Sequence, residues 1–154
     1  MKKILAMAAA GVLAMALVGC GGSESNEGGS LDAPAQEQVQ KDFDGSSFSD
    51  TGAGTFYIST PAGTSEGGNI PQLIVEKDTA LTQIGCGTEG MEYASCMVYI
   101  DGMESEELVT SDMMQGSLTL SGDALAPGVH TVEVVKMDGD SPAIYKIAQY
   151  EVAE

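Results

Sequence analysis

From Thr55 to the C-terminus, hydrophobic residues fall into short runs that are separated by glycine, proline and aspartate. Several runs alternate apolar and polar positions, as in Ser117-Leu118-Thr119-Leu120, which is typical of strands with one buried face. Asp-Gly pairs at 101–102 and 138–139 end two of the runs and indicate hairpin turns. No stretch keeps a helical period over about ten residues. The predicted strands are residues 55–60, 73–75, 80–84, 95–100, 107–110, 117–120, 129–137 and 143–152.

Seven or eight short strands in about 100 residues predict an all-β sandwich. Residues 118–152 also resemble the E–F corner of bacterial immunoglobulin-like domains, because two leucines precede a turn that ends in Gly128 and alternating valines follow it. In that family a tyrosine often sits at the corner and bonds back to the backbone, whereas this chain has His130 there. The resemblance implies a single immunoglobulin-like β-sandwich.

The last predicted strand shows a change of phase. Tyr145 and Ile147 share one face, while Ala148, Tyr150 and Val152 share the other. We therefore expect a β-bulge near Ile147.

The N-terminus begins with Lys2 and Lys3, followed by an uncharged apolar run of 15 residues at 4–18. This run is shorter than the ~20 residues that a membrane-spanning helix needs, and with its charged start it is typical of an export signal. The following Leu17-Val18-Gly19-Cys20 resembles the lipobox of bacterial lipoproteins. The resemblance implies cleavage before Cys20, a diacylglyceryl thioether on Cys20 and often an acylated N-terminus. Such a chain is held by its lipid on the extracytoplasmic face of the cell membrane.

Residues 20–53 are rich in glycine, serine and acidic side chains, and this composition predicts a flexible tether. A flexible chain of this length has an r.m.s. reach of about 30–35 Å. Phe43 and Phe48 stand out in it and mark where the chain begins to dock on the domain. The expected organisation is a signal peptide at 1–19, a tether at 20–53 and a sandwich domain at 54–154.

The charge of the chain limits the classes of molecule that it can bind. The formal net charge is −17. After removal of residues 1–19 the chain keeps four lysines, no arginine and all 23 acidic residues, which gives −19. Nucleic-acid binding is therefore excluded, because it depends on cations that neutralise phosphates. The lipid on Cys20 is the expected membrane contact.

With Cys20 modified, Cys86 and Cys96 remain, an even pair in an oxidising compartment. They do not form a Cys-x-x-Cys motif. We expect one disulfide that staples the loop between two consecutive strands and is worth about 2–3 kcal/mol. The two are too close in sequence for the inter-sheet bridge of antibody domains.

Two patterns in the sequence bear on metal binding, one for calcium and one for copper(I). Residues 42–50 alternate aspartates around a glycine, as calcium loops do, but the glycine falls at the fourth position and Ala53 at the twelfth, where an EF-hand has glutamate. Copper(I) is a second possibility, since six methionines and His130 follow Cys20, but the methionines lack a clustered spacing. No residue is assigned to a metal or cofactor.

No catalytic constellation is visible. His130 is the single histidine, no Gly-x-Ser-x-Gly occurs, and Glu104, Glu106 and Glu107 are typical of a solvated turn. We expect a non-enzymatic, lipid-anchored surface module for protein interaction, adhesion or envelope structure, with residues 66–69 and 104–114 as presenting surfaces. The alternative is an extracytoplasmic ligand- or metal-binding lipoprotein, for calcium ahead of copper.

Overall fold

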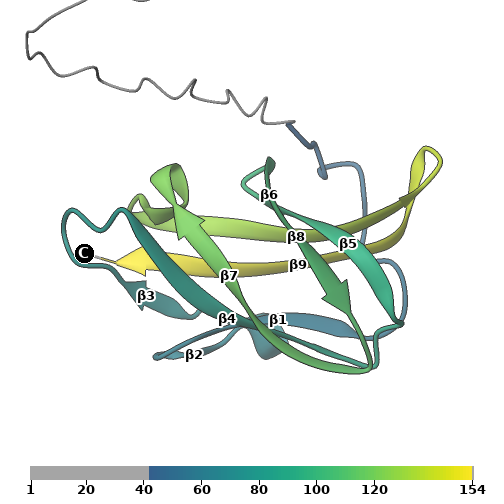
Figure 1. Ribbon diagram of the computed structural model, residues 1–154, viewed down its shortest axis with the longest axis horizontal. Coiled ribbons are helices and arrows are strands. Elements are labelled where there is room, and N and C mark those ends of the chain that lie inside the picture. The colour runs from purple at the N-terminus through teal and green to yellow at the C-terminus, as the bar shows by residue number, and fades with distance from the viewer. Residues whose placement is uncertain (1–41, 154) are drawn as a thin grey trace, which may run out of the picture. The chain divides into compact units, whose positions relative to one another are not determined.

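Nine strands run through residues 42–153, the part of the chain that the computed structural model describes (Figure 1). Two short 3-10 turns, η1 and η2, interrupt the strands, and within these residues no helix is long and apolar enough to cross a membrane. The elements are β1 (Thr55–Thr60), β2 (Gly63–Thr64), η1 (Glu66–Gly68), β3 (Gln72–Ile74), β4 (Leu81–Glu89), β5 (Ala94–Ile100), β6 (Met103–Thr110), β7 (Met113–Ser121), η2 (Gly122–Leu125), β8 (Gly128–Asp138) and β9 (Ser141–Ala153).

The strands form two sheets, with order β2-β1-β4-β7 in one and β3-β9-β8-β5-β6 in the other. All pairs are antiparallel except β3 with β9. The chain crosses between the sheets five times, at β2–β3, β3–β4, β4–β5, β6–β7 and β7–β8, and the two sheets lie over one another (Figure 1). The prediction of an all-β, two-sheet fold is confirmed. All eight predicted strands are present, and the ninth is β2, whose two residues lie in a polar loop.

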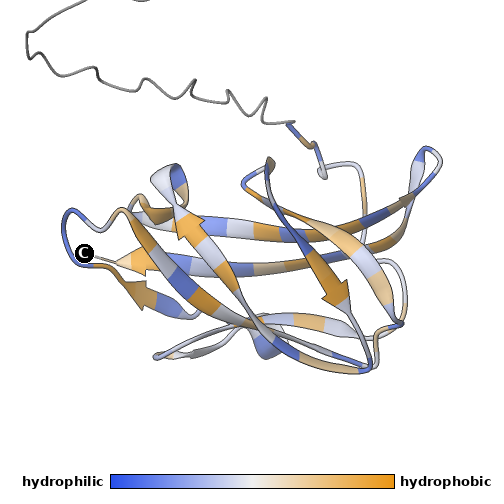
Figure 2. Ribbon diagram, in the orientation of Figure 1, coloured by the Kyte–Doolittle hydropathy of each residue, from blue (hydrophilic) through white to orange (hydrophobic). Residues whose placement is uncertain are grey.

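The core fills the space between the sheets. The apolar and polar alternation is visible along the ribbons in Figure 2, and it places one face of each central strand inward. Val132 and Val134 on β8 are fully buried, as are Leu118 and Leu120 on β7. Burying each such side chain contributes about 1.5–3 kcal/mol, so these positions hold the sheets together.

Residues 42–54, which we call the N-terminal strap, lie against the outer face of the five-stranded sheet. The Phe43 ring stacks on Tyr99 with centroids 4.5 Å apart, and Phe48 meets Tyr145 edge-on at 5.7 Å. Thr51 exchanges two backbone hydrogen bonds with Tyr145. Phe43 and Phe48 thus dock as expected. The folded unit extends ahead of residue 54 because two aromatic side chains outweigh the polar residues around them.

Strand β9 has no irregularity at Ile147. Even-numbered residues from Ile144 to Val152 face the core, and odd-numbered residues face outward. The expected bulge near Ile147 is wrong: Lys136 pairs with Ile144 and Met137 pairs with Pro142, so the extra, unpaired residue of this ladder is Ala143 of β9. The change of phase was only apparent, because the strap buries Tyr145 on the outer face and makes both faces of β9 apolar there.

Candidate functional site

The residue with the most definite predicted chemistry, Cys20, lies outside the described residues. The same holds for the signal peptide at 1–19 and for residues 20–41 of the predicted tether. Lipidation of Cys20 and the membrane address therefore stay predictions.

Cys86 and Cys96 are free thiols that face the core from opposite sheets. Cys86 lies on β4 and Cys96 on β5, and both belong to the cluster between the sheets. The expected disulfide is not formed in this structure. The two cysteines lie on consecutive strands, as expected, but β4 and β5 belong to different sheets. Burial raises the pKa of the Cys86 thiol to about 11, with a smaller contribution from Glu106, so this thiol stays protonated and unreactive near neutral pH.

His130 holds the turn before β8. Its Nδ1 lies 2.6 Å from the Asp101 carboxylate and its Nε2 lies 2.7 Å from the backbone oxygen of Ala126, four residues upstream. The ring also stacks on Tyr150 at 5.1 Å. His130 therefore forms a bond back to the backbone of the preceding turn. Both ring nitrogens are occupied by these contacts, so the ring acts as a structural clamp.

The aspartates of residues 42–50 contact different partners. Asp44 accepts a hydrogen bond from the Ser46 backbone, and Asp50 pairs with Lys146. Among residues 42–153 no group of three His, Cys, Asp or Glu side chains is arranged to hold a metal ion. The methionines are dispersed as well: Met91 and Met114 pack at the core, Met97 packs beneath the strap, and Met113 and Met137 are exposed.

The two predicted presenting surfaces lie on different parts of the sandwich. Residues 66–69 form η1 and its C-terminal neighbour. Residues 104–114 belong to β6 and the start of β7, at the edge where the two sheets meet. At that edge Glu106 accepts a hydrogen bond from the Thr119 backbone N–H at 2.7 Å. This bond links the two sheets at the β6–β7 side, which also has a hollow of about 530 Å³ lined by Glu104, Glu106 and Thr119. The opposite side of the sandwich has another.

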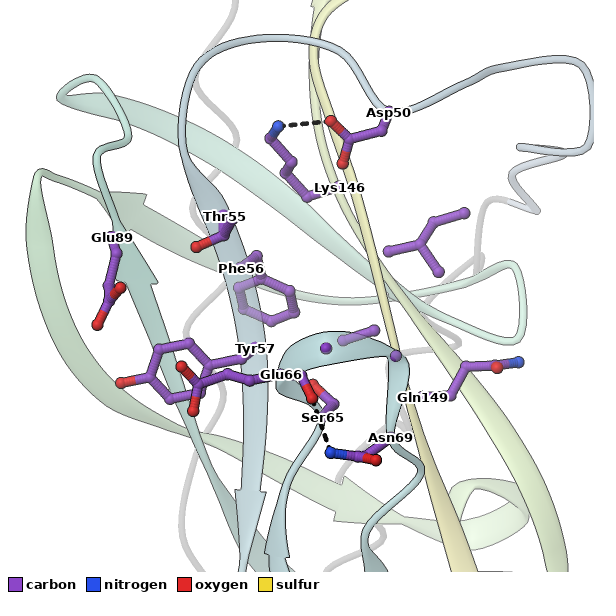
Figure 3. Close-up of a pocket in the computed structure, with 14 residues that line it drawn as sticks. Asp50, Thr55, Phe56, Tyr57, Ser65, Glu66, Asn69, Glu89, Lys146 and Gln149 are labelled. Atoms are coloured by element: carbon purple, nitrogen blue, oxygen red, sulfur yellow. Dashed lines mark hydrogen bonds and ion pairs between the residues drawn. The ribbon is translucent and has the colours of Figure 1, made fainter.

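On that opposite side lies a groove of about 560 Å³, which we call the β1–β9 groove (Figure 3). This volume is within the range of ~300–1,000 Å³ that is common for ligand pockets. Residues 55–57 of β1 form one wall and residues 146–149 of β9 form the other. The Phe56 ring lies between the two walls in Figure 3.

The loop that carries η1 closes one end of the groove. The Ser65 side chain accepts a hydrogen bond from the Ile58 N–H at 2.8 Å, and the Ser65 N–H donates to the Ile58 carbonyl at 2.9 Å. Asn69 donates to the Glu66 carbonyl at 2.8 Å (Figure 3). The Ser65 bonds fix the start of the loop to β1, and the Asn69 bond closes the loop on itself. The predicted presenting loop at 66–69 is thus part of the groove.

An ion pair closes the other end. Lys146 is only 2% exposed, and its Nζ donates to Asp50 at 2.7 Å and to the Gly52 carbonyl at 2.9 Å (Figure 3). Asp50 remains mostly exposed, so the pair is buried on the lysine side alone. The contact ties the strap to β9, because a buried ammonium group requires a partner.

The wall formed by β9 has an unpaired stretch of backbone. Tyr145 bonds to Thr51 on the side away from β8, and the Glu151 N–H donates to Pro71 on that same side. Backbone groups of alternate strand residues point the same way, so Ile147 and Gln149 also point away from β8. Neither forms a backbone hydrogen bond on that side within the described chain. The gap lies between two segments that are already paired.

Neither the buried position of Lys146 nor this strand edge was predicted from the sequence. Lys146 shares the phase of Ala148 and Tyr150, which is a signal that it points inward. The gap itself depends on where the strap and β3 dock, and no local pattern encodes that.

The chain matches no protein-family profile, and comparisons with curated proteins and with solved structures find no match either. The proposed function therefore rests on the sequence and the geometry of the chain.

Proposed function

We propose that this chain is a lipid-anchored, extracytoplasmic module that binds a protein partner and carries out no chemistry of its own. The observation that carries the proposal is the unpaired backbone of Ile147 and Gln149 in the β1–β9 groove. Open strand edges are sites where proteins add a strand from another chain, so they are normally short, covered or charged. Here the edge lies in a groove whose ends are fixed by hydrogen bonds.

The extracytoplasmic, membrane-anchored location is part of the same proposal. Lys2, Lys3, the apolar run at 4–18 and the lipobox-like Leu17-Val18-Gly19-Cys20 support export and lipidation at Cys20. Residues 21–41 follow as an acidic, glycine-rich segment that would separate the sandwich from the membrane surface. The module would thus be displayed at a distance from the lipid.

We also infer that the sandwich is of the bacterial immunoglobulin-like kind. The support comes from two sheets with changes of sheet at β4–β5 and β6–β7, and from the bond of His130 to Ala126 at the turn before β8. The corner bond of such domains has the same direction, from the start of a strand back to the preceding turn.

The anchor is tested with Cys20→Ala in the full chain. We expect the variant to move from the membrane fraction to the soluble fraction, because a thioether to diacylglycerol cannot form without the thiol. A Gly22→Ala variant, which leaves the cysteine intact, is the control and is expected to stay in the membrane. Unchanged membrane association of Cys20→Ala would contradict lipid anchoring.

Partner binding is tested by placing a photo-crosslinking residue at Gln149 in the groove and, as a control, at the exposed Asp140 in the β8–β9 turn. In the native envelope we expect a discrete protein adduct from position 149 and none from position 140. The absence of an adduct at position 149, or the same adducts at both positions, would contradict a partner in the groove.

A further inference from the structure

The free edge of β9 has the length of a short strand. Tyr145 and Glu151, which are both paired, bound it. A strand rises about 3.4 Å per residue, so the six steps from 145 to 151 span about 20 Å. An added segment of about four or five residues fits between Thr51 and Pro71, a common strand length. It would meet the N–H and C=O groups of Ile147 and Gln149.

The opposite wall offers backbone groups as well. Ile58 of β1 bonds to Ser65 on the side away from β4, and by alternation Phe56 points to that side too. No hydrogen bond from the Phe56 backbone to that side is found in the described part of the chain. A segment in the groove is therefore flanked by strand edges from both sheets, which favours an extended conformation over a helix.

The acidic side chains around the groove favour a guest segment with positive charge. Asp50, Glu66 and Glu89 line it, and Lys146 is its single cation among the described lining residues. Lys146 is already paired with Asp50, which leaves Glu66 and Glu89 for a guest. With a net charge of −17 on the whole chain, lysine or arginine side chains are attracted and acidic segments are repelled.

The same charge argues against a second copy of this chain as the guest. Two copies would bring two strongly acidic surfaces together, which opposes association at low ionic strength. A basic partner has the opposite response, because its attraction is greatest at low salt and is screened at high salt.

We propose that the β1–β9 groove binds an extended, lysine- or arginine-rich segment of a partner protein, and that this segment pairs as an added strand with Ile147 and Gln149 of β9. The inference rests on the proposed function and specifies its partner chemistry. Backbone pairing supplies the geometry, and Glu66 and Glu89 supply the preference for cations.

The test uses the full lipidated chain in a neutral detergent and a synthetic peptide of about eight residues that alternates lysine and valine. The matched control is the same peptide with N-methyl groups on alternate amides along the edge that would pair. It keeps every charge and side chain and loses the pairing donors. A glutamate–valine peptide tests the sign of the charge.

Binding of the lysine–valine peptide is expected to slow hydrogen exchange at the Ile147 and Gln149 amides. N-methylation is expected to weaken binding about tenfold, the effect of losing about two backbone hydrogen bonds. The double variant Glu66→Gln/Glu89→Gln is expected to weaken binding several-fold at low salt only, while Asp140→Asn does not. The glutamate–valine peptide is expected not to bind.

Equal binding of the N-methylated peptide would overturn strand pairing, because attraction by charge alone would then explain the association. Protection of the two amides that rises with protein concentration without peptide would show that a second copy is the guest, and would overturn the proposal too. An adduct at position 149 together with unprotected amides would overturn the strand mode and leave the proposed partner binding intact. If position 149 gave no adduct and the two amides stayed unprotected, the proposed partner binding and the strand pairing would both be overturned.

Discussion

At the scale of single residues, the buried polar groups of this domain each have a defined partner. Glu133 is 7% exposed and accepts a hydrogen bond from the Tyr145 hydroxyl at 2.5 Å, and the same hydroxyl contacts the Gly45 carbonyl at 3.1 Å. No buried side-chain nitrogen or oxygen in the described residues lacks a hydrogen-bond partner. Leaving one such group without its partner costs about 1–3 kcal/mol, so substitutions at these pairs are sensitive probes.

His130→Phe is the first such probe. The ring stack on Tyr150 is retained in shape, but the Ala126 carbonyl and the Asp101 carboxylate lose their donor. We expect the free energy of unfolding to fall by about 1–3 kcal/mol, measured by urea denaturation. Val129→Phe, next to it on the exposed side of β8, is the control. A stability equal to that of the parent protein would contradict the clamp.

Alkaline pH is the second probe. Burial, followed by the hydrogen bond to Glu133, raises the pKa of Tyr145, and burial also raises the pKa of Tyr150. In the reduced protein, where Cys86 is a free thiol, its pKa is raised from 9.0 to about 11. Because these groups ionise more readily in the unfolded chain, stability is complete below pH ~9 and is lost as pH rises through the folded pKa values. The free energy of unfolding, measured by urea denaturation, should therefore fall between pH 9 and 11, at most by about 1.4 kcal/mol per pH unit for each group.

A Tyr150→Phe variant provides the comparison. It lacks one of the ionising groups, so its stability should fall less steeply above pH 10. A rise in the urea midpoint from pH 9 to pH 11 would contradict the assignment.

At the scale of elements, the strap is the clearest case of a segment whose role depends on distant partners. Its aromatic residues contact Tyr99 and Tyr145, which come about 50 and 100 positions later. Gly45 also lies so close to Glu133 and Tyr145 that a Cβ there would collide with both side chains. The strap therefore needs its aromatic pair and this glycine together.

Removal of the aromatic pair tests the strap. In Phe43→Ala/Phe48→Ala we expect faster hydrogen exchange on the outer face of β5, β8 and β9, and a loss of about 2–5 kcal/mol in stability, since large-to-small substitutions at packed aromatics carry this cost. Tyr93→Ala is the matched control, because Tyr93 is 82% exposed. Equal effects of the two variants would show that the strap contributes no packing.

Most of the strands could be predicted from the sequence, whereas their neighbours could not. The alternation of Ser117 to Leu120 and the Asp101-Gly102 turn are local signals, and both hold in the structure. The assignment of β4 and β5 to different sheets is a property of the whole chain. That is why Cys86 and Cys96 were expected at a loop and are found in the core. The groove was missed for the same reason, since its edge exists only once Thr51 and Pro71 have docked on β9.

At the scale of the whole molecule, the two cysteines lie on opposite sheets, Cys86 on β4 and Cys96 on β5, and both are free thiols in this structure. We propose that the two thiols are oxidised to a disulfide in the exported protein, because the predicted extracytoplasmic location is oxidising and both cysteines lie in the same buried cluster. The mass of the exported protein should then be lower by two hydrogens, and reduction should lower its stability by about 2–3 kcal/mol. Cys86→Ala/Cys96→Ala serves as the control that reduction does not affect. Free thiols in protein isolated from the envelope without reductant would contradict the bond.

The position of the strap also determines how the molecule responds to mechanical force. A pull on the chain ahead of Asp42 acts first on the contacts of Asp42 with Met103 and of Phe43 with Gly102. These contacts break one after another as the strap peels from the sheet, whereas the ladders between the core strands are not pulled until it has come away. The thirteen residues of the strap, 42–54, then add about 45 Å to the length of the extended chain. The strap would therefore detach and lengthen the chain under force before the sandwich itself unfolds.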